Sequence, residues 1–277
     1  MLKKGRPREL LQTRQLQRHN KMSNRRPPSA QERASLFALL DNAKRAVAFT
    51  GAGVSTLSGI PDFRGPDGIY QQMDAQKIFD IDEFDRNPQF FYSHAVELVY
   101  GKLKEPSVVH QALAALEEQG AIRGIITQNI DLLHTRAGSK NVQEVHGSAL
   151  RNYCRSCGKT FSFDEVVTTA RAGTVPHCGC GGVIKPDIVF FGEALPEKVF
   201  ETARELAEEA DLILVLGTSL EVQPAASLPR LTIRNGGKLI LINDQPTWAD
   251  SVASLRLSDL ASAGALLLEY AEAHKKT

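Results

Sequence analysis

The sequence predicts an α/β protein in which a doubly wound parallel β-sheet carries helices on both faces. Apolar runs of strand length alternate with segments of helical periodicity, a pattern typical of parallel strands joined by helical crossovers. Several of these runs end at glycines or small polar residues, as strands do where such sheets bind ligands. All four cysteines lie within residues 154–180, which predicts a second, smaller unit.

The composition predicts a soluble protein with a full hydrophobic core. The chain has 277 residues, of which 42% are hydrophobic, and its apolar runs are far shorter than the roughly 18 residues of a membrane span. Clustered cysteines are typical of a metal site in a reducing compartment, because the disulfides of a secreted protein are usually spread along the chain. We therefore expect a cytoplasmic protein.

The first 28 residues differ from the rest because they are strongly basic. They carry nine Lys or Arg against one acid, Glu9, and removing them from the totals of 33 and 32 leaves 24 basic and 31 acidic residues. The mildly acidic remainder argues against a broad nucleic-acid footprint. We expect a disordered arm whose deletion leaves folding and activity unchanged. Organelle targeting, nucleic-acid contact through the arm, and a true start at Met22 stay open, whereas the arm lacks the apolar stretch of a secretory signal.

The predicted elements follow the alternation in order. A helix is expected at 30–43, where Ser29 and Glu32 have the spacing of a capping box, and a buried strand at 45–50. Asn87-Pro88 introduces a helix in the stretch 66–105, which shows no strand pattern and whose aromatics we assign to the core. The remaining expected elements are a helix at 108–119, strands at 122–127 and 142–145, a helix at 197–209, a strand at 211–216, a helix from Pro224, a strand at 238–242 and a helix at 261–274.

The strand at 45–50 runs directly into Gly51-Ala52-Gly53, a shape typical of phosphate binding. Glycines allow a tight turn and close ligand approach, so successive N–H groups could point at an anion. Thr56 stands where the dinucleotide fingerprint G-x-G-x-x-G has its last glycine, so the motif alone is weak. Ser55 and the run Pro61-Asp62-Phe63-Arg64 strengthen it, and a plain turn followed by a solvated loop stays the alternative.

Polar or glycine motifs follow other predicted strands as well, and in a parallel sheet they would share one edge. No acid stands at a convincing distance of about 20 residues after the first glycine, as it does in hydride-transferring enzymes, which disfavours an ordinary dehydrogenase. Each motif could also be an ordinary turn between strand and helix. The motifs are Gly51-Ala52-Gly53, Gln128-Asn129-Ile130-Asp131, His146, Gly217-Thr218-Ser219 and Asn243.

His146 is the best candidate for a general base among the seven histidines. It combines a strand end with a following glycine, and imidazole transfers protons near neutral pH. A structural histidine is the alternative. His110 and His134 fall within helical patterns, so we expect them to be structural.

The cysteines form two pairs, Cys154-x-x-Cys157 and Cys178-x-Cys180, close to the zinc-ribbon template. Four thiolates complete a tetrahedral zinc site and leave no open position, so we expect a structural metal. The second pair is one residue shorter than usual, and His177 could in principle replace a cysteine. Redox-active thiols are the other alternative.

These motifs in series resemble the sirtuin family of NAD-dependent protein deacylases. The resemblance covers about residues 31–270 and rests on GAGVSTLSGIPDFRG, TQNIDLLH, VHG at 145–147, the cysteine pairs, KPDIVFFGE, LGTSLEVQPAA and LIN. It implies a Rossmann-like NAD-binding domain and a small domain, with NAD and acyl-lysine entering the cleft between them. The implied limits are 29–65, 106–150 and 186–277 for the large domain, and a helical module at 66–105 with a zinc ribbon at 151–185 for the small one.

The resemblance also implies roles for individual residues. His146 would be the catalytic base. The cofactor side would comprise Gly51, Ala52, Gly53, Ser55, Ile60, Asp62, Phe63, Arg64, Tyr70, Gln128, Asn129, Ile130, Asp131, Gly217, Thr218, Ser219 and Asn243, with Asp259 and Leu260 near the adenine. Val189, Phe191, Gly192, Glu193 and Leu195 would bind the acylated peptide as an added strand, and Cys154, Cys157, Cys178 and Cys180 would hold zinc.

The implied reaction moves an acetyl group from lysine to ADP-ribose. Asp131 and Ile130 would orient the nicotinamide, the acyl oxygen would attack the anomeric carbon, and His146 would remove a ribose hydroxyl proton. Relatives that favour succinyl-lysine or malonyl-lysine carry a Tyr-x-x-Arg pair, but here Tyr92 is followed by Ala95, so we expect acetyl-lysine to be preferred. A protein mono-ADP-ribosyltransferase and a non-enzymatic NAD sensor are the rival hypotheses.

Overall fold

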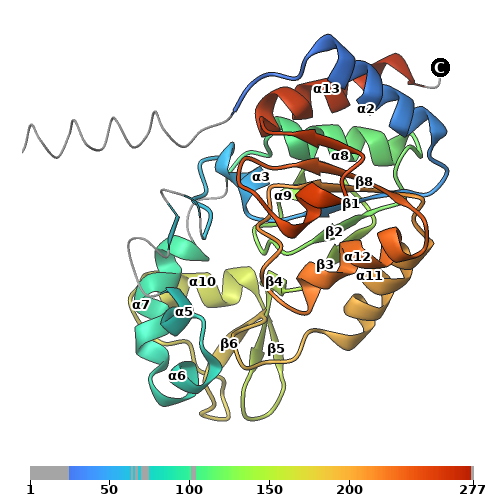
Figure 1. Cartoon of the computed structure of the whole chain (residues 1–277). Helices are drawn as coiled ribbons and strands as arrows, with labels where there is room; N and C mark the ends of the chain where they lie inside the picture. Colours follow the sequence, from blue (N-terminus) through green and yellow to red (C-terminus); the bar gives the residue numbers. More distant parts are fainter. Residues whose placement is uncertain (1–24, 64, 66–67, 70–74, 101–103, 276–277) are drawn as a thin grey trace, which may run out of the picture.

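The computed structural model describes residues 25–63, 65, 68–69, 75–100 and 104–275. Its larger sheet has six strands in the order β3-β2-β1-β7-β8-β9, and every neighbouring pair is parallel (Figure 1). The predicted parallel α/β fold is thus confirmed. In chain order the strands are β1 (Ala46–Thr50), β2 (Ile125–Thr127), β3 (Val142–Glu144), β7 (Leu212–Leu216), β8 (Lys238–Ile242) and β9 (Leu255–Leu257).

Helices cover both faces of this sheet because alternate residues of its central strands point to opposite sides. Ala48 and Leu214 pack with α2, α8 and α13, whereas Val47 and Ile213 pack with α11 and α12 (Figure 1). The continuous apolar runs in β1 and β7 are therefore buried on both faces. The covering helices are α2 (Ala30–Asn42), α8 (Val108–Glu118), α11 (Glu197–Glu209), α12 (Leu228–Arg234) and α13 (Leu260–Ala273), and the 3-10 turns η1 (Ala225–Ser227) and η2 (Trp248–Ser251) lie between α11 and β9 in the chain.

The predicted helix limits agree with the local signals that suggested them. Ser29 and Glu32 form the expected capping box at the start of α2. Gly120 adopts a left-handed φ of 75° just after α8, which explains why that helix ends there. Among the described residues, no helix is both long and apolar enough to cross a bilayer.

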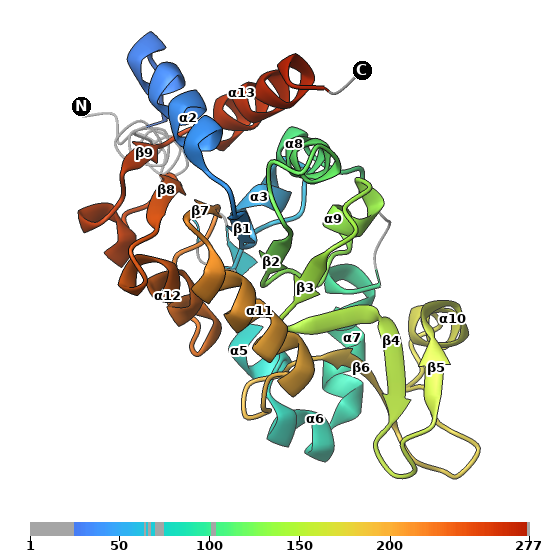
Figure 2. The same cartoon turned by 90° about the vertical axis from the view of Figure 1, so that its right-hand side faces the viewer.

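A second sheet of three antiparallel strands, in the order β5-β4-β6, carries the cysteine segment (Figure 2). Its elements are β4 (Gly147–Cys154), β5 (Thr160–Ser162), the helix α10 (Phe163–Arg171) and β6 (Ile184–Ile188). This sheet runs past both predicted limits of the zinc ribbon, 151 and 185. The division into domains itself stays a prediction.

The helical stretch expected at 66–105 contains α5 (Ala75–Ile78), α6 (Ile81–Arg86) and α7 (Pro88–Leu98). Aromatic side chains of this stretch, such as Phe84 and Phe91, are buried in one cluster with residues of α10, β4 and β6. Val166 of α10 and Ile184 of β6 belong to the same cluster. Edge-to-face packing, such as that of Phe84 with Phe91 at 5.4 Å, stabilises this core. The helical stretch and the cysteine sheet therefore share one hydrophobic core.

Candidate functional site

The polar motifs that follow the strands lie along one edge of the larger sheet. Backbone hydrogen bonds join the residue after each strand to the last residue of the neighbouring strand. The N–H groups of Gln128, Gly51 and Gly217 donate to the carbonyls of Thr50, Leu216 and Ile242 respectively. The carboxyl ends of β1, β2, β7 and β8 are thereby level with one another. The sequence argument correctly placed these motifs together.

The turn Gly51-Ala52-Gly53 packs directly against the turn at Gly217-Thr218. A Cβ on Gly51 would lie 2.7 Å from the Cβ of Thr218, and a Cβ on Gly53 would lie 2.8 Å from the Cα of Gly217. Glycine is therefore required at both positions because any larger side chain would clash with the neighbouring turn, whether or not a ligand also approaches.

The expectation that successive N–H groups of this turn point at an anion is wrong for Gly51, whose N–H donates to the Leu216 carbonyl, and for Gly53. The N–H groups of Gly53, Val54 and Ser55 donate to the carbonyls of Gly217, Gly51 and Ala52 respectively. The short helix α3 (Gly53–Thr56) thus uses its first amides internally. Phosphate binding at this turn would have to rely on other groups.

Ser55, Asn129 and Asp131 form one hydrogen-bonded chain at the end of β2. The Asn129 amide donates to the Ser55 hydroxyl at 3.1 Å and to the Gly51 carbonyl, and the Ser55 hydroxyl donates to the Asp131 carboxylate at 2.6 Å. Asp131 also accepts from the N–H of Leu133 at the start of α9 (Leu133–Arg136). Ser55 and Asn129 are buried, so these groups have fixed orientations.

Two leucines beside these motifs have left-handed backbone conformations. Leu132, which follows Asp131, has a φ of 67°, and Leu220, which follows Ser219, has a φ of 56°. Such conformations are costly for leucine and cluster at functional sites. Both outliers fall where the sequence predicted ligand contacts.

His146 lies between this polar chain and the cysteine-bearing sheet. Its Nδ1 lies 3.0 Å from the Gln128 carbonyl, and because a carbonyl only accepts, Nδ1 carries the proton and Nε2 has the free lone pair. Burial lowers the pKa of His146 below its ordinary value, although the bond to Gln128 offsets part of this effect. A half-buried neutral imidazole with a free Nε2 is suited to accept a proton.

The backbone after β6 passes next to His146. The N–H of Val189 donates to the His146 carbonyl at 2.9 Å, and Phe191 exchanges backbone hydrogen bonds with Phe79 and Ile81. Gly192 is exposed and has a φ of 93°. The segment predicted to bind the peptide is therefore adjacent to the predicted base. Leu195, at its far end, packs against the core on the α11 face of the larger sheet.

Several of the other predicted cofactor residues have structural partners of their own. Asp62 accepts from the N–H of Gly65, and Gln128 donates to the Thr218 hydroxyl at 2.9 Å. Asp259 caps α13, and Leu260 packs on the core, which gives both a structural role near the sheet edge. Ile60, Ile130 and Phe63 are half-buried, Asn243 is buried at the end of β8, and Arg64 and Tyr70 lie outside the described residues.

His110 and His134 form a buried pair beneath the polar chain, with ring centroids 4.6 Å apart. The Nε2 of His134 contacts the Thr50 hydroxyl at 2.9 Å, and burial lowers the pKa of His134. Burial lowers the pKa of His110 to about 4, partly opposed by Asp131. The sequence suggested that both are structural, but nothing in their spacing could have shown that they pair.

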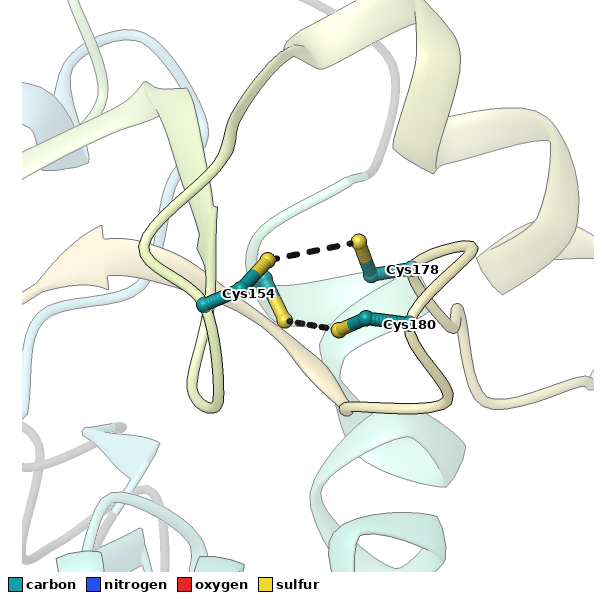
Figure 3. A group of neighbouring side chains, drawn as sticks. Cys154, Cys178 and Cys180 are labelled. Atoms are coloured by element: carbon teal, nitrogen blue, oxygen red, sulfur yellow. Dashed lines mark hydrogen bonds between the residues drawn. The ribbon is translucent and has the colours of Figure 1, made fainter.

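The four cysteines converge, as the spacing predicted, and their ligand atoms lie within 4.8 Å of one another. Figure 3 shows sulfurs of Cys154, Cys178 and Cys180 turned toward one another. The Sγ–Sγ separations include 3.5 Å and 3.7 Å, close to the ~3.8 Å expected between thiolates around a tetrahedral zinc with bonds of ~2.3 Å. The donor set therefore fits a closed zinc site. His177 is exposed, bonds to the Val175 carbonyl and is not part of this cluster.

Comparisons with known proteins agree with this geometry. A model of the Sir2 family matches residues 51–224. The NAD-dependent protein deacetylase of Thermotoga maritima is 47% identical over 220 residues, covering 79% of this chain and 89% of that protein. The NAD-dependent protein deacylase 2 of Archaeoglobus fulgidus is 40% identical over 240 residues, covering 86% and 94%.

Solved structures agree as well. The structure of Sir2 with a deacetylated p53 peptide and 3'-O-acetyl ADP ribose has a TM-score of 0.83 and 43% identity, covering 88% of this chain and 99% of that one. The structure of Sir2Tm bound to a propionylated peptide has a TM-score of 0.78 and 41% identity, covering 85% and 97%.

Proposed function

Because the chain belongs to the Sir2 family, we propose that it is an NAD-dependent protein-lysine deacetylase that transfers the acetyl group of acetyl-lysine to ADP-ribose. The products are lysine, nicotinamide and O-acetyl-ADP-ribose. The match over residues 51–224 and the related deacetylases support this activity. So does a structural neighbour described with a deacetylated peptide and acetyl ADP ribose.

The observation that carries the proposal is the position of His146. Its Nε2 is free, its ring is fixed by the Gln128 carbonyl, and its own carbonyl holds Val189 of the proposed peptide segment. On the other side, the chain from Asn129 through Ser55 to Asp131 offers an amide, a hydroxyl and a carboxylate of fixed orientation. A nicotinamide and its ribose require such groups.

Each group then has a distinct task. Asp131, held by Ser55 and by the N–H of Leu133, orients the carboxamide end of the nicotinamide. His146 accepts a ribose hydroxyl proton at Nε2, because its lowered pKa keeps the imidazole neutral. The exposed backbone at Gly192 receives the peptide as an added strand. A bound zinc, held by the four cysteines, would supply structural stability to the smaller sheet and no catalytic step.

The acyl preference follows from the buried side of α7. The Tyr92 hydroxyl donates to the Ile184 carbonyl at 2.6 Å, and Ala95 is fully buried. The buried side of α7 therefore offers no arginine and no free phenol to bind the free carboxylate of a succinyl group. We propose that acetyl-lysine is preferred and that the same peptide carrying succinyl-lysine is a poor substrate.

The proposal is tested by mass spectrometry of an acetyl-lysine peptide incubated with the protein, with and without NAD. We expect NAD-dependent loss of the acetyl group together with nicotinamide and O-acetyl-ADP-ribose in equal amounts. ADP-ribose attached covalently to protein, with the peptide still acetylated, would instead favour a mono-ADP-ribosyltransferase. A higher rate on the succinylated than on the acetylated peptide would contradict the acyl preference.

We further propose a cytoplasmic location, which fits the absence of disulfides among the four described cysteines.

A further inference from the structure

Lys185, in the edge strand β6 of the smaller sheet, carries a charge that is completely removed from solvent. Its side chain is 0% exposed, and its Nζ lies 2.8 Å from the Glu193 carboxylate. Nζ also donates to the carbonyls of Ile188 at 2.7 Å and Pro186 at 3.2 Å. A buried ammonium is tolerated only when it is paired and hydrogen-bonded in this way.

The Glu193 carboxylate connects this ammonium to the backbone of the segment after β6. The same oxygen, Oε2, accepts from the Phe190 N–H at 2.8 Å, and the Phe190 carbonyl accepts from the Glu193 N–H. The Phe190 ring lies with its centroid 3.8 Å from Nζ, so a cation–π contact adds to the hydrogen bonds. Residues 185–193 are thus folded around one buried charge.

The segment held in this way carries the proposed peptide-binding groups. Phe190 is buried and packs on Phe79 and Phe84, whereas the flanking Val189 and Phe191 are only half-buried. Lys185 therefore supports the segment from the core side. None of the contacts of Lys185 involves a residue of the cofactor side.

Lys185 is also close to the cysteine cluster in the smaller sheet. Ile184, the residue before Lys185, is paired with Cys154 in the register of β4 and β6. Lys185 itself is paired with Tyr153, and its Nζ lies 5.7 Å from the centre of the Tyr153 ring. A disturbance at the cysteines could therefore be transmitted to the peptide segment through two adjacent residues of β6.

We propose that the Lys185–Glu193 ion pair is a positioning device that holds residues 188–193 in the conformation needed to bind the acyl-lysine peptide. The proposal rests on the proposed function for the identity of the peptide. Lys185 acts through the segment and contacts neither the peptide nor NAD. An ion pair that served stability alone could be replaced by neutral side chains without loss of peptide affinity.

The test uses three variants: Lys185→Met, Glu193→Gln, and the double variant that combines them. The control is Lys198→Met, which removes an exposed lysine from α11. Acetyl-peptide affinity is measured by fluorescence anisotropy, NAD affinity by calorimetry, and backbone protection of residues 188–193 by hydrogen exchange. We expect Lys185→Met to weaken peptide binding at least about 10-fold, to speed exchange in the segment, and to change NAD affinity by less than about 2-fold. Lys198→Met should match the wild type in all three.

The double variant separates positioning from stability. It removes the unpaired, partly buried carboxylate that Lys185→Met leaves behind, so we expect its melting temperature to recover while its peptide affinity stays low. Recovery of both would overturn the proposal, as would equal weakening of NAD and peptide binding. If Lys185→Met does not fold, Glu193→Gln carries the same test. Turnover by the wild type decides the proposed function separately, since the affinities do not depend on it.

Discussion

At the scale of single residues, the environment of His146 determines what this side chain can do. The Gln128 carbonyl fixes the proton on Nδ1, and burial disfavours the imidazolium form. Both effects leave a neutral Nε2 available as a base. Sequence reasoning could select His146 from its place at a strand end, but the carbonyl partner comes from an adjacent turn that spacing alone could not place.

The first prediction concerns the pH dependence of deacetylation. Because the pKa of His146 is lowered from 6.5, the base stays neutral, and the acidic limb of kcat/KM for the acetyl-peptide should have its midpoint below pH 6.5. The measurement is a pH series at saturating NAD. A midpoint above pH 6.5 would mean that burial does not control this histidine.

The second prediction concerns stability and the pair His110 and His134. Both have pKa values lowered by burial, that of His110 to about 4, so the unfolded chain binds protons that the folded protein excludes. The free energy of unfolding should be greatest above pH 6.5 and fall on acidification toward pH 4, by up to ~1.4 kcal/mol per pH unit for each histidine.

Urea unfolding at a series of pH values measures this slope. His110→Gln should flatten it, whereas the same substitution at the exposed His177 is the matched control and should not. An unchanged slope in His110→Gln would show that His110 takes up its proton equally in both states.

At the scale of elements, the predictions were good where a local pattern determines the structure. The helix at 197–209 and the strand at 238–242 agree with α11 and β8, since an amphipathic run and an apolar run mark their lengths. The antiparallel strands β4 and β5 and the helix α10 were not predicted. β4 bends at a register shift between Ser148 and Asn152, which interrupts the alternation expected of a strand. β9 was also missed because it has only three residues.

The interlocked glycine turns illustrate the same limit. The sequence marked Gly51, Gly53 and Gly217 as special, but it suggested tight turns and ligand approach rather than contact between the two turns. Their close contact with one another depends on β1 and β7 being neighbours in the sheet. Non-local pairing of this kind leaves no signal within either motif.

The third prediction concerns the cysteine-bearing sheet as a unit. The protein should contain about one zinc per chain, and removing it should release the loop between Cys178 and Cys180 from β4, because four thiolates would then repel one another without a cation. Metal analysis, circular dichroism and the deacetylation rate, before and after strong chelation, measure this.

Activity should be lost with the metal and return when zinc is added back. Full activity in metal-free protein would contradict a structural zinc. A rate that stays low after zinc is restored, with the fold regained, would also contradict it.

At the scale of the whole molecule, the two sheets meet where β3 of one leads into β4 of the other (Figure 2). His146 lies between these two strands in the chain. The backbone after β6 returns to the same place, as the bond between Val189 and His146 records. The chemistry therefore depends on both parts of the fold. Of the basic N-terminal arm, the described residues Arg25 and Arg26 form ion pairs with Asp244 and Glu32.

The fourth prediction concerns that arm, whose first 24 residues lie outside the described part of the chain. Deleting residues 1–24 should leave the melting temperature and the KM for NAD unchanged, since these residues carry none of the motifs of the predicted site. Deleting residues 1–28 also removes the ion pairs of Arg25 and Arg26, whose side chains are exposed, and the hydrogen bond from the Arg26 N–H to the Ser258 hydroxyl, which together contribute little. Loss of catalysis in either protein, measured beside the full chain, would show that the arm takes part in the reaction.

The central claim is that His146 acts as the base in a site where NAD and an acetylated lysine meet. The most direct test is the single-turnover deacetylation rate of His146→Ala, measured in protein whose NAD affinity equals that of the wild type. The account predicts that NAD still binds and that deacetylation falls by at least about 100-fold, as removal of a general base does. A wild-type rate in that variant would contradict it.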